Sequence, residues 1–271
     1  MFIVVKNSST QKRHYRFWQR TMPAKLFRVL LPKGQYFRLE VDTRNRKKLT
    51  KILENIAKTV HVKWIFCDDF LCLPDNLAKV DSRVYRTHLL CNAVLQIIDS
   101  AQRSGVFPRV VLIDLPGENL SMAEKLMRKT AQVTIITRKK HEYSKLNEKL
   151  SLENGTQFVL RNTFEDIVDA DIVLSGHEIC INFHSSKCLV FAPDTLGAWD
   201  VGSDCLVIPE ECAGYIPRGI AVDVFLSALW EHKKARQLDV ALPNGLCYGG
   251  EVRKLNDFQN KVNNNFLRGG Q

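Results

Sequence analysis

Hydrophobic and polar positions between residues 109 and 138 follow the order of a β-α-β unit. An apolar run at 110–113 has the length of a strand, and a loop at 114–119 follows it. Apolar residues then recur at helical spacing over 120–127, and a second β-branched run at 133–137 closes the unit. Parallel strands joined by a helix are the starting unit of a doubly wound sheet, so the pattern predicts such a sheet here.

The same alternation continues towards the C-terminus and extends the predicted sheet. Further strand-length apolar runs lie at 157–160, 171–175, 188–192 and 205–208, and a helical pattern lies at 219–234. We therefore expect residues 105–250 to form an α/β domain with a doubly wound, mainly parallel sheet. Residues 251–271 are polar and are expected to form a peripheral C-terminal tail.

The N-terminal part of the chain predicts a smaller α/β domain over residues 1–80. Its expected elements are strands at 2–5, 26–31, 36–41 and 62–67, a hairpin turn at 32–35 and a helix at 44–58. A long amphipathic pattern then predicts a connecting helix over residues 81–104.

Positive charge is concentrated in this first domain. The chain of 271 residues has a formal net charge of +10, and residues 1–51 contain 14 of the 39 Lys and Arg but only two of the 29 acidic residues. Basic and aromatic side chains mix over 12–20, as in surfaces that bind phosphates and stack on bases. A polyanion such as nucleic acid, or an acidic protein, is therefore a candidate partner of residues 12–48. The alternative is a solvated basic exterior on a small domain.

The sequence predicts no association with a membrane. No apolar run reaches the roughly 18 residues of a spanning helix, and the first residues lack the pattern of a signal peptide. The eight cysteines include no C-x-x-C pair, and several lie in apolar runs, which suits a reducing compartment. We therefore expect a cytoplasmic protein.

From residue 107 to 210, the order of elements resembles the NAD(P)-binding Rossmann superfamily. The two-domain order with a long connecting helix is distantly similar to shikimate dehydrogenase-like proteins. The superfamily places a G-x-G-x-x-G motif between the first strand and helix, so that the backbone approaches a pyrophosphate. In this chain Asp114, Pro116 and Asn119 occupy the three glycine positions. The lysine and aspartate of a shikimate dehydrogenase-like substrate site are not identifiable in the first domain.

This degenerate glycine motif decides the function that we expect. A carboxylate at Asp114 would repel a pyrophosphate, and Pro116 has no N–H group to donate. We therefore expect a Rossmann-like protein that has lost conventional dinucleotide catalysis and acts as a binding or regulatory module rather than as an enzyme.

A second hypothesis is an NADP-dependent oxidoreductase with an atypical phosphate loop. Residues 137–140 carry basic side chains at the end of the second strand, where relatives that use NADP often bind the 2′-phosphate. The same corner would suit a phosphorylated small molecule, and the alternative is a solvated basic loop. Ligands of open α/β sheets bind beyond the carboxyl ends of the strands. The candidate cofactor-binding residues at these ends are Asp114, Gly117, Asn119, Thr137, Arg138, Lys139, Ser175 and Gly176.

Catalytic and metal-binding candidates follow the fourth predicted strand of this domain. His177 and Glu178 are the nearest candidates for acid–base catalysis. His177, Cys180, His184 and Cys188 supply four nitrogen and sulfur ligands, which is a candidate zinc set. The apolar residues between them alternate, which favours a plain edge strand and places His177 on the opposite face from Cys180 and His184.

Overall fold

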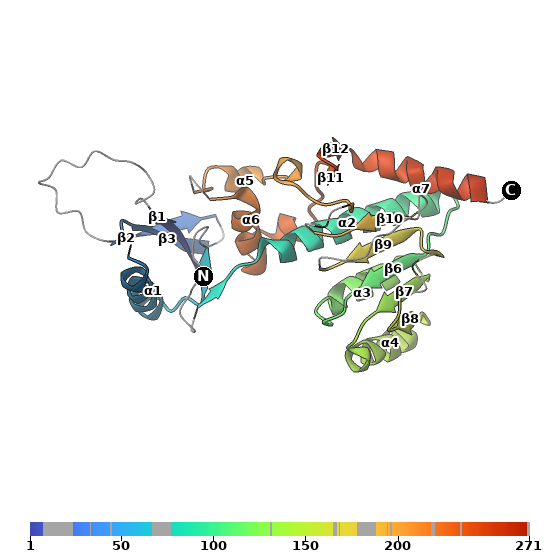
Figure 1. Ribbon diagram of the computed structural model, residues 1–271, viewed down its shortest axis with the longest axis horizontal. Coiled ribbons are helices and arrows are strands. Elements are labelled where there is room, and N and C mark those ends of the chain that lie inside the picture. Colours follow the sequence, from blue (N-terminus) through green and yellow to red (C-terminus); the bar gives the residue numbers. More distant parts are fainter. Residues whose placement is uncertain are drawn as a thin grey trace, which may run out of the picture. The chain divides into compact units, whose positions relative to one another are not determined.

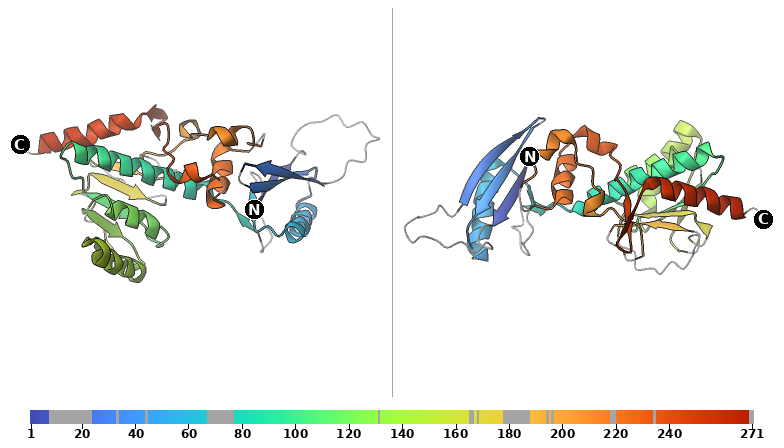
Figure 2. Two further views of the ribbon diagram at one scale, coloured as in Figure 1. Left: turned by 180° about the vertical axis from the view of Figure 1, so that it is seen from behind. Right: turned by 90° about the horizontal axis from the view of Figure 1, so that it is seen from above.

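In the computed structural model, the chain forms two compact units (Figures 1 and 2). Unit 1 consists of Met1–Tyr85 and Ile208–Asp239, and unit 2 consists of Arg86–Val207 and Val240–Gln271. The structure describes only the backbone of residues 6–7, 79, 154 and 263–269. It describes the rest of the chain except for residues 8–23, 33, 44, 67–76, 131, 165–166, 168, 178–187, 194, 196, 218–219, 234 and 270–271.

Within its described residues, unit 1 contains a five-stranded sheet in the order β2-β3-β1-β4-β5. The strands are β1 (Phe2–Asn7), β2 (Ala24–Leu31), β3 (Gly34–Val41), β4 (Trp64–Phe66) and β5 (Ala78–Lys79). β2 and β3 form an antiparallel hairpin, and the other neighbouring strands are parallel. Helix α1 (Arg46–Val60) follows the hairpin. The hairpin, helix and following strand that the sequence predicts are therefore confirmed.

The two faces of this sheet bury different side chains. On one face, Ile3 packs with Leu53 of α1 in an apolar core. On the other face, the ring of Phe2 stacks on Tyr36 with centroids 5.3 Å apart and lies 6.3 Å from the ring of Phe225. The returning part of unit 1 forms α5 (Glu210–Ala213), α6 (Val222–Glu231) and the short η4 (Arg236–Asp239). Because Phe225 belongs to α6, residues 208–239 complete the second core of the N-terminal sheet.

The main sheet of unit 2 has five parallel strands among the described residues, in the order β10-β9-β6-β7-β8. The strands are β6 (Val110–Ile113), β7 (Val133–Ile136), β8 (Val159–Arg161), β9 (Ile172–Ser175) and β10 (Leu189–Phe191). The helices are α2 (Ser82–Arg103), which begins in unit 1, α3 (Leu120–Met127), α4 (Lys140–Asn154) and α7 (Leu255–Gly269). The chain runs from β6 outward to β8 and then returns to β9 and β10 on the other side. This order confirms the predicted Rossmann-like, doubly wound parallel sheet.

The apolar runs reveal this sheet in the sequence because β6 and β9 are buried over their whole length. The strand predicted at 205–208 is wrong. Ser203–Cys205 instead form a short helix, η3, and the N–H groups of Cys205 and Leu206 donate to Gly202 and Ser203 within the same turn. Because these N–H groups donate within the turn, they are not available to pair with a neighbouring strand.

The C-terminal segment of unit 2 contains regular structure. β11 (Leu246–Tyr248) and β12 (Glu251–Arg253) pair as an antiparallel ribbon, and α7 follows them. Phe258 of α7 is buried, with its ring 4.4 Å from that of Trp199, and α7 runs alongside α2 (Figures 1 and 2). None of the helices in the described part of the chain combines the length and the hydropathy that crossing a bilayer requires.

Candidate functional site

The carboxyl ends of β6 and β9 lie side by side, because Ile113 pairs with Ser175 in the register of the two strands. The chain leaves β6 towards β7 on one side and leaves β9 towards β10 on the other. Open α/β sheets bind ligands at such a switch point. The loop after β6 and the turn after β9 therefore meet where the sequence predicts a ligand.

The carboxylate of Asp114 is the centre of this region. The side chain is fully buried, and its Oδ1 accepts hydrogen bonds from the backbone N–H of Glu118 at 3.2 Å and from Nδ2 of Asn119 at 3.0 Å. Its Oδ2 accepts from the backbone N–H of Asn119 at 2.8 Å and from the hydroxyl of Tyr143. The N–H groups immediately before α3, which point towards a phosphate in a nucleotide-binding loop, thus donate to the protein's own carboxylate.

Tyr143 is a residue of this site that the sequence analysis did not identify. It lies in α4, its side chain is buried, and its hydroxyl connects α4 to the loop after β6. Burial, together with the hydrogen bond to Asp114, raises the pKa of the Tyr143 phenol well above its ordinary value. The phenol therefore keeps its proton and donates. An acidic residue a few positions before a predicted helix was the available signal for a carboxylate that accepts from the start of that helix.

The neighbouring predicted residues are in direct contact around this carboxylate. The amide of Asn119 lies so close to Gly176 that a Cβ atom on the glycine would be 2.3 Å from Nδ2. A Cβ atom on Gly117 would be 2.6 Å from the Cβ of Lys139. Thr137 is buried, and its Oγ1 accepts from the N–H of Lys139 at 3.0 Å. Since Asn119 and Gly117 also bond to Asp114, the structure brings together six of the eight predicted cofactor-binding residues.

Arg138 and Lys139 form the basic corner that the sequence predicts after β7. Both side chains are exposed, and the backbone N–H of Arg138 donates to the carbonyl of Leu115 at 3.3 Å. This bond holds the turn after β7 against the loop after β6. The two cations therefore lie beside the closed loop and face solvent.

His177 lies beside two carboxylates. Its Nε2 is 3.7 Å from Oδ1 of Asp114 and 3.8 Å from Oε2 of Glu118, and it has no hydrogen-bond partner among the described residues. The backbone of His177 is held by Ser175, whose hydroxyl donates to its carbonyl at 2.8 Å. The imidazole is thus placed to interact electrostatically with the loop, while Glu178, the second acid–base candidate, lies outside the described residues.

The candidate zinc set is only partly described. Cys180 and His184 lie outside the described residues, and Cys188 packs in the apolar core of unit 2 with Val190 and Ile167. Burial raises the pKa of the Cys188 thiol to about 11. Within the described part of the chain, no group of three or more His, Cys, Asp or Glu side chains is arranged to hold a metal ion.

Comparisons with known proteins give a remote similarity in structure. No protein-family model matches the chain, and no curated protein matches it in sequence. Among solved structures, the chain is similar to L-tryptophan dehydrogenase from Nostoc punctiforme, with 10% sequence identity and a TM-score of 0.34 over 86% of this chain and 78% of that chain. A similarity of this size carries no argument about activity.

Proposed function

We propose that this chain is a Rossmann-like binding or regulatory module that has lost conventional dinucleotide catalysis. The observation that carries the proposal is the buried Asp114 carboxylate, which accepts hydrogen bonds from the N–H groups of Glu118 and Asn119 at the start of α3. These groups are the ones that a pyrophosphate needs in a nucleotide-binding Rossmann domain.

Electrostatic repulsion supports the same conclusion. A phosphate at the start of α3 would approach a carboxylate that is already buried there. Two unit negative charges about 4 Å apart repel by about 4 kcal/mol at an effective dielectric constant of 20. Phosphate binding would therefore require the Asp114 side chain to leave four hydrogen bonds that the described residues donate.

Thermal unfolding with NAD, NADH, NADP and NADPH tests this proposal. A ligand at 100 times its dissociation constant stabilises a native protein by about 2.7 kcal/mol, which shifts the midpoint measurably. We expect no shift with any of the four. A shift with NADPH that Arg138→Ala abolishes would overturn the proposal and establish the NADP-dependent alternative. Leu152→Ala, which changes an exposed side chain of α4, is the control variant.

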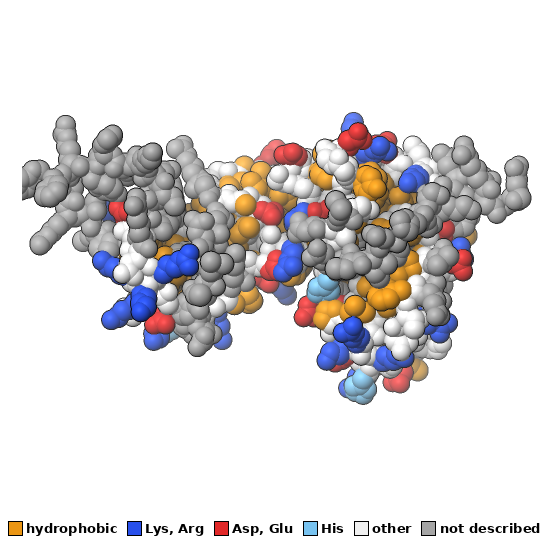
Figure 3. All heavy atoms as spheres, viewed as in Figure 1, with side chains coloured by type: hydrophobic (Ala, Val, Ile, Leu, Met, Phe, Trp, Pro, Cys, Tyr) orange, Lys and Arg blue, Asp and Glu red, His pale blue; other side chains and the backbone are white. Residues whose placement is uncertain are grey.

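A specific observation favours polyanion binding by unit 1 as a second candidate function. The first turn of α1 carries Arg46, Lys47 and Lys48 and no acidic residue, and all three side chains are exposed. Cations at the N-terminus of a helix oppose its dipole, so this arrangement costs stability unless an anion binds there. On the face drawn in Figure 3, Lys and Arg side chains gather over the region of α1. The aromatic residues at 12–20 lie outside the described residues.

Salt dependence of oligonucleotide binding tests this second candidate. We expect a labelled single-stranded oligonucleotide to bind, with an affinity that falls steeply as salt rises. Lys47→Gln with Lys48→Gln should reduce the slope of log K against log salt by about 1.4, since each phosphate contact contributes about 0.7. The matched control changes two other exposed lysines, Lys58 in the last turn of α1 and Lys63, which follows the helix. Absent binding, or a slope that only the control pair changes, would refute it.

A further inference from the structure

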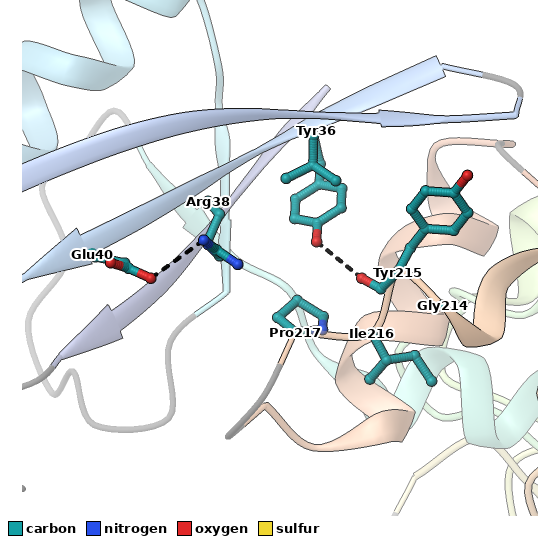
Figure 4. A pocket seen from close by; sticks show the side chains of 8 residues that line it. Tyr36, Arg38, Glu40, Gly214, Tyr215, Ile216 and Pro217 are labelled. Carbon is teal, nitrogen blue, oxygen red and sulfur yellow. Dashed lines mark hydrogen bonds and ion pairs between the residues drawn. The ribbon is translucent and has the colours of Figure 1, made fainter.

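A cavity of about 390 Å³ lies within unit 1, between the β2–β3 hairpin and residues 214–217 (Figure 4). Tyr36, Arg38 and Glu40 line it from alternate positions of β3, so all three project from the same face of the sheet. Val29, Ile216 and Pro217 supply apolar walls. The volume is that of a small-molecule site, which is typically apolar with a few polar groups.

The wall opposite the sheet is held in place by Tyr36. Its hydroxyl donates to the carbonyl of Tyr215 at 2.9 Å. Burial raises the pKa of Tyr36, against an opposing effect of Arg38, so the phenol remains a donor. The cavity is therefore built by a defined contact between β3 and the returning segment of unit 1.

Arg38 is the group in this cavity with unmet hydrogen-bonding capacity. Its guanidinium lies 4.8 Å from the ring centre of Phe27, and its Nη2 lies 3.4 Å from Oε1 of Glu40. Its Nε–H is buried and has no acceptor among the described residues. Lys25 pairs with Glu40 in the strand register, so two cations and one carboxylate lie on this part of the sheet. A buried donor without an acceptor is destabilising, and an anionic oxygen beside Arg38 would supply one.

We propose that this cavity binds a small molecule with a carboxylate on an apolar body, the carboxylate accepting from Arg38 and the body contacting Val29, Ile216 and Pro217. This site is separate from the loop after β6. A nucleotide screen and a carboxylate screen can therefore fail independently.

Calorimetric titration of the full chain with hexanoate and benzoate, and with hexanamide and benzamide as neutral counterparts, tests the proposal. We expect the carboxylates to bind at least about tenfold more tightly than the amides, the ratio that a charge-assisted hydrogen bond provides. Arg38→Ala should abolish that preference. Arg28→Ala is the matched control, because Arg28 is exposed on the adjacent strand and pairs with Phe37, so it faces the other side of the sheet.

Filling the cavity gives an independent variant. Ile216→Trp should abolish binding of both carboxylates while leaving the circular dichroism spectrum unchanged. Three results would overturn the proposal: no heat of binding with either carboxylate at millimolar concentration, equal binding of carboxylates and amides, or equal losses in Arg38→Ala and Arg28→Ala.

A different observation, in unit 2, concerns two thiols. The Sγ atoms of Cys205 and Cys247 lie 3.3 Å apart although 42 positions separate them in sequence. Cys247 exchanges two backbone hydrogen bonds with Asp200, of 2.7 and 3.0 Å, and its Sγ lies against Gly202, where a Cβ atom would be 2.8 Å away. The N–H of Cys205 donates to Gly202. The backbone thus fixes both thiols around one glycine.

The two thiols flank the part of the chain that belongs to unit 1. Residues 208–239 leave unit 2 shortly after Cys205, and the chain returns before Cys247. A disulfide between Cys205 and Cys247 would therefore enclose residues 208–239 in a covalent loop. We infer that Cys205 and Cys247 form a disulfide by exchange with a low-molecular-weight disulfide such as oxidised glutathione.

The exchange balances in two steps. The half-buried Cys247 thiol loses its proton to the solvent and attacks the small disulfide, which leaves a mixed disulfide and releases a small thiolate that takes up a proton. The Cys205 thiol then loses its proton and attacks the Cys247 sulfur, which releases the second small thiol. Burial, the largest cause, together with contact with the Cys247 thiol, raises the pKa of the Cys205 thiol above its ordinary value. The second step is therefore expected to accelerate as the solution becomes more alkaline.

Treatment of the full chain with oxidised glutathione, followed by alkylation and peptide mass analysis, tests the exchange. We expect the eight thiols to fall to six and a cross-linked peptide pair containing Cys205 and Cys247 to form. Closing a loop of this length should raise the melting temperature by about 8 to 16 °C. Cys205→Ser should stop at the mixed disulfide on Cys247. The control Cys91→Ala should still lose two thiols. Eight unchanged thiols, or a stable mixed disulfide in the unsubstituted chain, would refute the inference.

Discussion

Substitutions at Asp114 and Tyr143 test how strongly the hydrogen bonds to the Asp114 carboxylate stabilise the loop after β6. Tyr143→Phe deletes one donor and leaves the others in place. Asp114→Ala deletes the acceptor and leaves a buried phenol and two backbone N–H groups without their partner. The two changes, made singly and together, form a double-mutant cycle.

The expected magnitudes follow from the burial of these groups. A hydrogen bond to a charged acceptor contributes about 1.5 to 3 kcal/mol, and we expect Tyr143→Phe to lower the free energy of unfolding by that amount. Asp114→Ala leaves several donors without an acceptor, at about 1 to 3 kcal/mol for each buried one, and should cost about 3 to 5 kcal/mol. The coupling energy between the two changes should be about 1.5 to 3 kcal/mol.

Urea unfolding followed by circular dichroism measures these free energies. Tyr248→Phe is the control, because this phenol is 44% exposed and its loss should cost less than about 0.5 kcal/mol. A coupling energy below about 0.5 kcal/mol between Asp114 and Tyr143 would refute the reasoning. The carboxylate would then be hydrated rather than held by the loop, and the argument against a phosphate at the start of α3 would fail.

Three further measurements test the structure. Since the pKa of Tyr143 is raised, the folded chain keeps a proton that the unfolded chain loses, so stability should fall as pH rises above about 10. Urea unfolding of Tyr143→Phe should show a shallower loss, and equal slopes would contradict the assignment. Gly176→Ala should cost about 1 to 3 kcal/mol, because its Cβ would overlap Asn119, whereas Gly214→Ala meets no atom within 4 Å and should cost less than 1 kcal/mol. Phe225→Ala should cost about 3 to 5 kcal/mol by opening the aromatic core of unit 1, and a cost below 1 kcal/mol would contradict that packing.

Local hydrophobic patterns were sufficient to predict the parallel strands, because a strand buried on both faces reads as a short apolar run. They did not specify the strand order, which depends on pairings between β6 and β9 across about 60 positions. The same rule failed at 205–208. Residues in that run are apolar, but Val207 and Ile208 are 40% and 37% exposed, and the turn of η3 uses the local N–H groups. Hydrophobicity alone does not distinguish a strand from an apolar turn.

The sequence predicted that the loop after β6 and the turn after β9 lie at the same edge of the sheet, as the register shows, but it did not reveal the hydrogen bonds there. Asp114 was recognised as a charge that opposes a phosphate, but the sequence could not show that its carboxylate is buried and saturated with donors. One of these donors, Tyr143, lies 29 positions away, and whether it reaches the loop depends on how α4 packs. The proximity of Cys205 and Cys247 has the same origin. Contacts between residues that lie tens of positions apart depend on how the elements pack, and the local hydrophobic pattern of the sequence does not specify this packing.

Because the N–H groups of the loop after β6 bond to Asp114, we propose that the stability of this fold does not depend on binding a dinucleotide. In a nucleotide-binding Rossmann domain, the N–H groups at the start of the first helix donate hydrogen bonds to phosphate, so cofactor binding stabilises the native state. Here Asp114 completes them within the chain, while β6 and β9 remain fully buried and keep the sheet intact. On our proposal, the native state does not need a bound dinucleotide for its stability. In unit 1, Arg38 has a buried Nε–H without an acceptor among the described residues, and the first turn of α1 carries exposed cations. Substitutions at Arg38 or in the first turn of α1 should therefore reduce the stabilisation that a bound ligand provides, whereas substitution of Arg138 should leave it unchanged.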